Sequence, residues 1–192
     1  MLTQLSTVKA RLEITASTYD NLLTNAIKGV SARFDRECNR TLAWGVDITQ
    51  EFNAAQTEVA VAQYPIGVIT SFALKTTEDE SWVYQEWDTF QFLLRNKCII
   101  SLNRPLGTWR QQGQVTYSGG YVLPGDTPEP WQSALPDDLE QAAVEQCAAW
   151  FLNRDKVGLE VNWPAGNYQR LSQLPLLPSV RETLNKYRRF TL

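Results

Sequence analysis

The spacing of apolar residues changes twice along this chain, and this change constrains the fold more than any other feature. Apolar residues recur at helical spacing up to about Asp47, at every second position from there to Tyr117, and at helical spacing again from Pro136. Helical spacing places apolar side chains on one face of a helix, whereas alternation places them on one face of a strand. The order predicts an α+β fold, a helical bundle of about four helices with an inserted small antiparallel β subdomain.

The strongest helical pattern in the first half of the chain follows a shorter predicted helix around Val8 and Leu12. Its apolar residues share one helix face, namely Tyr19, Leu22, Leu23, Ala26, Ile27, Val30, Phe34 and Cys38. Gly29 lies inside that stripe and costs about 1 kcal/mol of helix stability relative to alanine. Its presence therefore favours a close crossing with another helix.

Turn residues divide the middle of the chain into short segments that we predict to be antiparallel strands. These segments are residues 57–61, 68–74, 81–87, 90–94, 98–102 and 114–117. Helix returns after Pro136, where Asp137 and Asp138 favour the positive end of the helix dipole. A final helix is predicted from Ser179 to about Arg189.

This pattern predicts three parts within a single folding unit. Residues 1–46 are expected to form the N-terminal helices of the bundle, residues 47–120 the antiparallel β subdomain, and residues 121–192 the C-terminal helices and interface segments. No apolar run approaches the roughly 20 residues that span a bilayer. Residues 1–6 lack the pattern of a signal peptide, so we expect a soluble, intracellular protein without membrane contact.

The composition argues against an enzyme. The chain holds no histidine, which excludes Ser-His-Asp and Cys-His nucleophile systems, histidine zinc sites and a histidine general base. Cys38, Cys98 and Cys147 form no CxxC pair and are expected to be small buried residues in a reducing compartment. Neither Gly119-Gly120 nor residues 164–167 match a phosphate-binding glycine motif. We therefore predict no catalytic residue, no cofactor and no metal site.

The charge distribution also argues against an enzyme. The chain carries 18 Lys+Arg and 21 Asp+Glu, a net charge of −3, so it is not a polycation built to neutralise DNA phosphates. The acidic residues at 137–138 fit a helix start, and those at 78–80 fit a solvated hairpin tip. Neither group is flanked by residues that would desolvate a catalytic carboxylate.

Seven tryptophans leave two interpretations open. Exposed tryptophans on one sheet face would stack on a ligand, as in a β-type carbohydrate- or peptide-binding module. Tryptophans are also common in cores and at the centres of protein interfaces, which is the interpretation we favour. Two are predicted on the sheet (Trp82 and Trp87), and four lie in or near predicted loops (Trp44, Trp109, Trp131 and Trp163).

Four parts of the sequence, in order, resemble the head-to-tail connector proteins of tailed bacteriophages, also called adaptor or head completion proteins. The opening helix pair of that family is similar to residues 8–12 and 19–23. Its proline-containing strand is similar to Tyr64-Pro65-Ile66-Gly67-Val68-Ile69. Its most specific motif is similar to Val115-Thr116-Tyr117-Ser118-Gly119-Gly120-Tyr121 followed by Leu135-Pro136-Asp137-Asp138-Leu139. Its closing helix is similar to Leu177-Pro178-Ser179-Val180 with Leu184 and Tyr187-Arg188-Arg189.

The resemblance implies a structural virion protein, the head-tail adaptor. Such a protein forms a ring, commonly of twelve subunits, below the portal, continues the DNA channel, and joins the capsid to the neck and tail. The implied partners are the portal protein, neighbouring copies of the chain and the next neck or tail-completion protein, while packaged DNA passes through non-specifically. The implied location is the neck of a virion that is assembled in the host bacterial cytoplasm. Another neck or tail-completion protein of the same particle is the main alternative.

Two segments are predicted to be interfaces. Residues 158–178 are rich in apolar side chains but show no clear periodicity, so we expect them to contact a neighbouring subunit or another neck protein through Trp163, Leu171, Leu174 and Leu176. The C-terminal segment carries two arginines and two apolar residues after Tyr187. We expect this segment to dock on the portal through Tyr187, Arg188, Arg189, Phe190 and Leu192, with the arginines paired to carboxylates.

Overall fold

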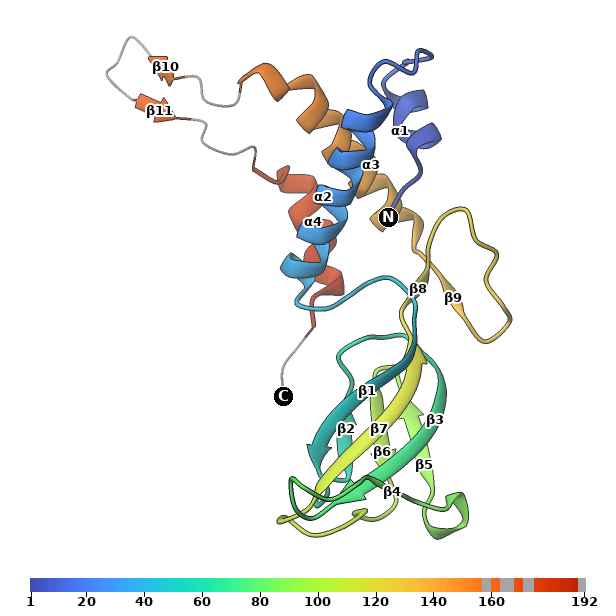
Figure 1. Ribbon diagram of the computed structural model, residues 1–192. Coiled ribbons are helices and arrows are strands. Elements are labelled where there is room, and N and C mark those ends of the chain that lie inside the picture. The colour runs from blue at the N-terminus through green and yellow to red at the C-terminus, as the bar shows by residue number, and fades with distance from the viewer. Residues whose placement is uncertain (157–159, 163–167, 171–174, 190–192) are drawn as a thin grey trace. The chain divides into compact units, whose positions relative to one another are not determined.

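The chain folds into two compact units, each described here by itself. A computed structural model describes residues 1–156, 160–162, 168–170 and 175–189 (Figure 1). The helical unit combines Met1–Asn39 with Leu135–Arg188, and the β unit comprises Arg40–Ala134 together with Arg189. The predicted α+β class is confirmed, because a region of antiparallel sheets is inserted in the sequence between two pairs of helices. The β unit extends beyond the predicted range 47–120 at both ends.

The described part of the helical unit contains the four predicted α-helices. They are α1 (Leu5–Arg11), α2 (Asp20–Cys38), α3 (Asp137–Leu152) and α4 (Pro178–Tyr187), with a 3-10 turn η2 (Arg154–Lys156) after α3. None of the described helices has the length and hydrophobicity needed to cross a membrane.

Helix α2 buries only part of its predicted apolar face. The buried residues are Leu23, Ile27, Val30, Phe34 and Cys38. Tyr19 and Leu22 are exposed. A Cβ atom placed on Gly29 would lie 3.5 Å from the ring of Trp150 in α3, so the predicted approach of a second helix at this glycine is present. The helix ends where Asn39 adopts a left-handed backbone with φ 52°, a conformation that asparagine tolerates well.

The region between α3 and α4 differs from the prediction. Strand β10 (Glu160–Asn162) pairs antiparallel with β11 (Tyr168–Arg170), although residues 158–178 show no periodicity in the sequence. Strands of three residues are too short to establish an alternating pattern. Helix α4 starts with Pro178 in its first turn and ends at Tyr187 rather than near Arg189, because Arg188 has an extended backbone.

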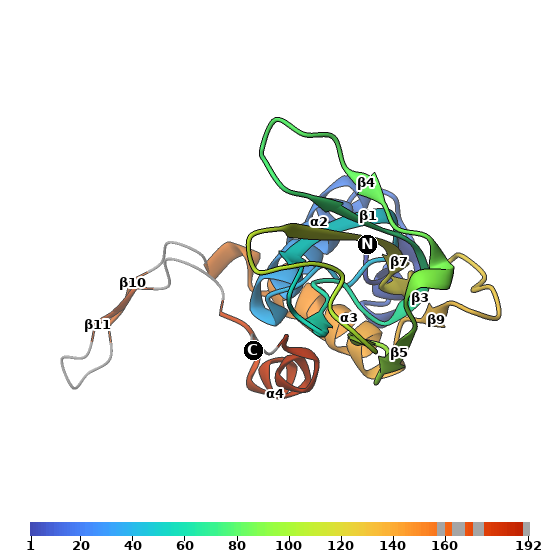
Figure 2. The same ribbon diagram turned by 90° about the horizontal axis from the view of Figure 1, so that it is seen from below.

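The antiparallel pairing predicted for the inserted strands is confirmed, and these strands form two sheets. The first consists, in spatial order, of β1 (Gly45–Asn53), β7 (Gln112–Gly119), β3 (Ile66–Lys75) and β4 (Val83–Tyr84). The second consists of β2 (Glu58–Ala60), β6 (Ile99–Leu102) and β5 (Phe92–Arg95). Every pair of neighbouring strands in both sheets is antiparallel. A short parallel pair follows, β8 (Tyr121–Val122) with β9 (Ser133–Ala134) (Figure 1). Figure 2 shows the strands β1, β7, β3 and β4 of the first sheet from below.

The core of the β unit draws on both sheets. Its buried members are Phe52, Val59, Val61, Ile66, Phe72, Phe90, Ile100, Leu102, Val115 and Tyr117. The Tyr117 hydroxyl accepts a hydrogen bond from the backbone N–H of Gln63 at 3.1 Å. Burial raises the pKa of Tyr117 above its ordinary value. The predicted strand 81–87 is shorter in the structure, and Trp87 lies in a 3-10 helix, η1 (Trp87–Thr89).

The two glycines that follow Ser118 allow neighbouring chain segments to approach the backbone closely. Gly120 has φ 109°, and a side chain there would collide with the backbone of Ala43. Its N–H donates to the Pro65 carbonyl at 2.9 Å, and the Tyr121 N–H donates to the Leu42 carbonyl at 2.8 Å. The glycine pair therefore allows three chain segments of the β unit to approach closely.

Candidate interaction surfaces

Acidic residues near the helix start and the hairpin tip are used in structural contacts. Asp138 of α3 accepts a hydrogen bond from the Tyr187 hydroxyl at 2.6 Å. The Glu80 carboxylate accepts hydrogen bonds from the backbone N–H groups of Thr76 and Thr77, at 3.1 and 3.3 Å, within the turn between β3 and β4. Within the described residues, no group of three or more Cys, Asp or Glu is arranged to hold a metal ion.

The three cysteines form no disulfide with one another, and they differ in burial. Cys38 and Cys147 are buried, and Cys98 is half-buried. Burial raises the pKa of Cys147 to about 12. Burial also raises the pKa of Cys98, and the nearby charge of Arg40 lowers it in part. A raised pKa leaves little thiolate at neutral pH, so Cys98 and Cys147 are poor nucleophiles.

Arg40 is a buried cation of the β unit and is not among the functional residues predicted from the sequence. It is 6% exposed, and its guanidinium carbon lies 3.6 Å from the ring centroid of Tyr64 and 5.5 Å from that of Tyr121. Its Nη1 donates to the Tyr64 carbonyl at 2.9 Å, while Nε and Nη2 lack a hydrogen-bond partner within the described residues. The aromatic faces offset part of the cost of removing the charge from water. No periodicity in the sequence predicts this burial.

Two tryptophans of the β unit, Trp82 and Trp87, pack against other side chains. Trp82 lies 4.8 Å beneath the Lys75 ammonium, and Trp87 packs against Phe72, Phe90 and Phe92. Trp150 is part of α3, and Trp163 lies outside the described residues. The packing of Trp87 within an aromatic cluster and of Trp82 against Lys75 favours the core and interface interpretation.

Trp44 and Trp131 form the one pair of neighbouring indoles among the described ring contacts. Their centroids are 5.5 Å apart with an interplanar angle of 59°. A Cβ atom on Gly67 of β3 would lie 2.5 Å from Trp44 and 3.2 Å from Trp131. The pair therefore packs directly over the backbone of β3, and Trp131 remains 48% exposed.

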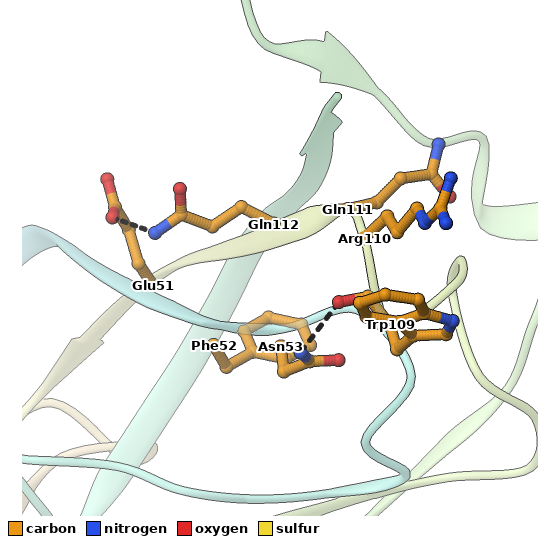
Figure 3. Close-up of a pocket in the computed structure, with 7 residues that line it drawn as sticks. All are labelled: Glu51, Phe52, Asn53, Trp109, Arg110, Gln111 and Gln112. Carbon is orange, nitrogen blue, oxygen red and sulfur yellow. Dashed lines mark hydrogen bonds between the residues drawn. The ribbon is translucent and has the colours of Figure 1, made fainter. Parts of the chain in front are cut away.

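A hollow of about 420 Å³ opens where β1 ends and β7 begins (Figure 3). Its lining residues are Glu51, Phe52, Asn53, Trp109, Arg110, Gln111 and Gln112. Trp109 is 70% exposed, and the guanidinium of Arg110 lies 4.9 Å from its ring centroid. The Asn53 amide donates to the Trp109 carbonyl at 3.1 Å, and the Gln112 amide donates to the Glu51 carboxylate.

A second hollow of about 220 Å³ adjoins the first and shares Arg110 and Gln112 with it. Its other lining residues are Lys75, Thr76, Thr77 and Glu78. Within the described residues, neither Lys75 nor Arg110 forms a salt bridge. We call the surface formed by Lys75, Trp82, Trp109 and Arg110 the tip surface. The sequence predicts its tryptophans on the sheet and in a loop, but no local pattern brings these four residues together.

The predicted portal residues lie at and after the end of α4. Tyr187 is half-buried, Arg188 is exposed and Arg189 is half-buried. Phe190 and Leu192 lie outside the described residues. The hydrogen bond from Tyr187 to Asp138 attaches the end of α4 to the start of α3.

The predicted subunit-interface residues are described only in part. Leu176 is buried in the segment just before α4. Its three companions, Trp163, Leu171 and Leu174, lie outside the described residues.

Comparison with protein families confirms the resemblance predicted from the sequence. Residues 2–86 match the model of a family described as "Phage gp6-like head-tail connector protein". No curated protein matches the chain.

Solved structures share the fold over nearly the whole chain. One match is a chain in a structure described as the neck of an empty GTA particle computed with C6 symmetry, with 14% identity, a TM-score of 0.58, and coverage of 98% of this chain and 90% of that chain. Another is a chain in a structure described as the virion of a native gene transfer agent (GTA) particle, with 12% identity, a TM-score of 0.61 and the same two coverages. At these identities the likeness establishes a shared fold.

Proposed function

We propose that this chain is a structural protein of a virion neck, a head-tail adaptor without enzymatic activity. The observation that carries the proposal is the match of residues 2–86 to a head-tail connector family. The likeness to a chain of a GTA neck structure supports it, because that likeness covers 98% of this chain and so extends well past residue 86. Another neck or tail-completion protein of the same particle is the alternative.

In the adaptor role, copies of the chain form a ring below the portal, continue the DNA channel and connect the capsid to the next neck or tail-completion protein. The similar neck structure was computed with C6 symmetry. Rings of six or of twelve copies are both compatible with a six-fold axis. The assembled ring belongs to the virion, and assembly takes place in the host bacterial cytoplasm.

Negative-stain microscopy of the purified protein, alone and mixed with purified portal rings of the same particle, tests this proposal. The expected result is a ring of copies stacked on the portal. Portal rings alone are the control. A protein that forms rings but binds only the tail-side component would support the alternative, and a protein that neither assembles nor binds would contradict the proposal.

The C-terminal segment is proposed as the part that docks on the portal. Arg188 is exposed at the end of α4, where it is available to a carboxylate of the partner. Deleting residues 188–192 should leave a folded protein, because Val180 and Leu184 of α4 stay buried and Tyr187 keeps its bond to Asp138. Co-sedimentation with portal rings should then be lost. An Arg181→Ala variant, altered at an exposed position of α4, should bind normally, and normal binding by the truncated protein would refute the docking proposal.

Residues around Trp163 are proposed to contact a neighbouring copy or another neck protein. A large aromatic side chain at the centre of an interface contributes a disproportionate share of its binding energy. Trp163→Ala should therefore reduce the yield of rings, measured by size-exclusion chromatography, while the circular dichroism spectrum stays unchanged. Trp87→Ala, which removes an exposed tryptophan outside the tip surface, serves as a second tryptophan deletion for comparison. Unchanged ring yield in Trp163→Ala would exclude this role.

DNA is proposed to pass the ring without being held. The net charge of −3 offers no large set of cations to replace the counterions of DNA. Filter binding or fluorescence anisotropy with duplex DNA at physiological salt should detect no tight complex. A tight complex that weakens steeply with added salt would show a grip on phosphates and contradict this proposal.

A further inference from the structure

We propose that, in the ring, the acidic loop of residues 123–132 of one copy occupies the tip surface of the next copy. The inference rests on the proposed function, because it requires that copies assemble side by side. It assigns the contact to two surfaces of the β unit that are complementary in charge and aromatic content.

The tip surface offers positive charge that is not neutralised by a salt bridge within the described part of the chain. Lys75 and Arg110 line adjoining hollows, and neither forms a salt bridge within the described residues. Two of the nearby carboxylates already have donors, since Glu51 binds the Gln112 amide and Glu80 binds the turn backbone. Glu78 lines the smaller hollow, whereas Arg110 lines both. Trp109 beside Arg110 adds a large exposed apolar face (Figure 3).

The acidic loop offers the complementary groups. No lysine or arginine occurs between Arg110 and Arg154 in the sequence, so the loop has no cation of its own. Asp126 and Glu129 are exposed, and neither forms a salt bridge within the described residues. Trp131, at the end of the loop, is 48% exposed. The loop therefore presents two carboxylates and an indole to a partner.

The acidic loop is also held in a defined shape. Its three prolines, Pro124, Pro128 and Pro130, restrict the backbone. The Asp126 N–H donates to the Leu123 carbonyl at 3.2 Å, and the Gln132 N–H donates to the Glu129 carbonyl at 2.9 Å. Packing of Trp131 against Trp44 fixes the end of the loop on the sheet. An ordered loop loses less conformational entropy on binding than a flexible one.

The positions of the two surfaces fit a head-to-tail contact between identical copies. The tip surface lies at the start of β7, and the acidic loop follows β8, just beyond the end of β7, so the two lie toward opposite ends of the same strand (Figure 1). One copy cannot satisfy both surfaces by itself. A contact between two different patches of identical subunits generates a ring when its rotation closes.

The charges favour this occupant over DNA. A grip on DNA requires several cations, because each neutralised phosphate contributes separately to affinity. The tip surface has two cations that form no salt bridge with any described residue, and Glu51 and Glu78 lie close by. Two cations instead match the two carboxylates of the acidic loop.

Charge reversal tests the contact in full-length protein. Variant one carries Lys75→Glu and Arg110→Glu, and variant two carries Asp126→Lys and Glu129→Lys. Each variant alone places like charges at every proposed contact. The protein concentration at which rings form, measured by mass photometry, should therefore rise at least tenfold for each variant. An equimolar mixture should regain rings in which the two variants alternate, since each new surface is then complementary to its neighbour. Regained assembly also shows that both variants are folded.

Matched controls and contrary outcomes separate this inference from the proposed function. Arg104→Glu and Glu86→Lys reverse exposed charges elsewhere on the β unit and should leave assembly unchanged. If wild type forms rings and both charge variants do so equally well, the contact is wrong and the adaptor role stands. If both variants lose assembly and the mixture does not regain it, the pairing of these two surfaces is wrong. If wild type forms no ring, alone or on the portal, the proposed function fails and this inference fails with it.

Discussion

The absence of a side chain at Gly67 allows Trp44 and Trp131 to pack over strand β3. The Trp44 indole occupies the space that a Cβ atom would take, at 2.5 Å. Gly67→Ala must displace Trp44, and with it Trp131. We expect the free energy of unfolding to fall by about 1 to 3 kcal/mol, the usual cost of overpacking. Urea unfolding followed by tryptophan fluorescence measures both the loss and the changed environment of the indoles.

Gly29 is the matched comparison within the same chain. A Cβ atom there would make an ordinary 3.5 Å contact with Trp150, and Gly29 lies inside helix α2. Gly29→Ala should therefore raise the free energy of unfolding by roughly 0.5 to 1 kcal/mol, since alanine favours the helix. If Gly67→Ala were also stabilising, the packing of Trp44 on β3 would be wrong.

At the scale of elements, Gln146 joins α3 to the entry of α4. It is fully buried at 0% exposure. Its amide donates to the Pro175 carbonyl at 3.2 Å and its carbonyl oxygen accepts the Leu177 N–H at 2.9 Å. Gln146→Leu would leave both backbone groups unpaired, so we expect a loss of roughly 2 to 5 kcal/mol in chemical denaturation. Gln141→Leu, on the exposed side of α3, should change stability by less than about 0.5 kcal/mol. Equal effects of the two substitutions would contradict the role of Gln146.

The same helix contains a group that links stability to pH. Burial raises the pKa of Cys147 from 9.0 to about 12 in the folded chain. The unfolded chain therefore loses the thiol proton first, so this contribution to stability is complete below about pH 9 and is lost as the pH rises toward 12. Each pH unit in this window should cost up to about 1.4 kcal/mol through this thiol.

A Cys147→Ala variant separates the contribution of the Cys147 thiol from that of other groups that titrate in alkali. One of these groups is Tyr117, whose pKa is also raised by burial. The unfolding free energy of the variant should fall less steeply between pH 9 and 12 than that of wild type. Parallel curves for the two proteins would show that Cys147 is not protected from ionisation.

At the scale of the molecule, the connectivity predicts that the two units unfold together. The helical unit consists of two chain segments separated by the whole β unit. Within the β unit, the Tyr121 N–H binds the Leu42 carbonyl and Tyr121 pairs with Ser133, so the entry and exit of the unit are held near each other. If the β unit unfolded, forming the helical unit would require closing a loop of about 95 residues, at a cost of roughly 4 kcal/mol.

Ile100→Ala tests this coupling, because Ile100 is fully buried in the β core. The loss of about 2 to 5 kcal/mol at that site should lower the midpoint of helix unfolding, followed by far-ultraviolet circular dichroism, together with that of the β unit. Leu93→Ala, at an exposed position of β5, should leave both midpoints unchanged. A helix midpoint that stayed at its wild-type value in Ile100→Ala would show independent units.

The sequence predicts the four helices and most strands of the insertion in the right order, although no predicted strand covers β1 (Gly45–Asn53). Helical spacing around α2 and α3 and alternation through β3 and β7 are local properties, because a residue's neighbours along one helix or strand are set by backbone geometry. The antiparallel insertion and the resemblance to connector proteins therefore followed without a structure. The strands β10 and β11 could not be predicted in this way, because three residues are too few to show an alternating pattern.

Only the tertiary structure decided which residues act together. The tip surface joins Lys75 to Trp109 and Arg110, which belong to separate strand ends that β3 and β7 bring side by side. The burial of Arg40 between aromatic rings depends on Tyr64 and Tyr121, which lie far from it in sequence. Hydrophobic spacing reports whether one element has an apolar face, but it carries no information about which distant side chains that face will meet. Register and close packing between elements supply that information, and they exist only once the chain has folded.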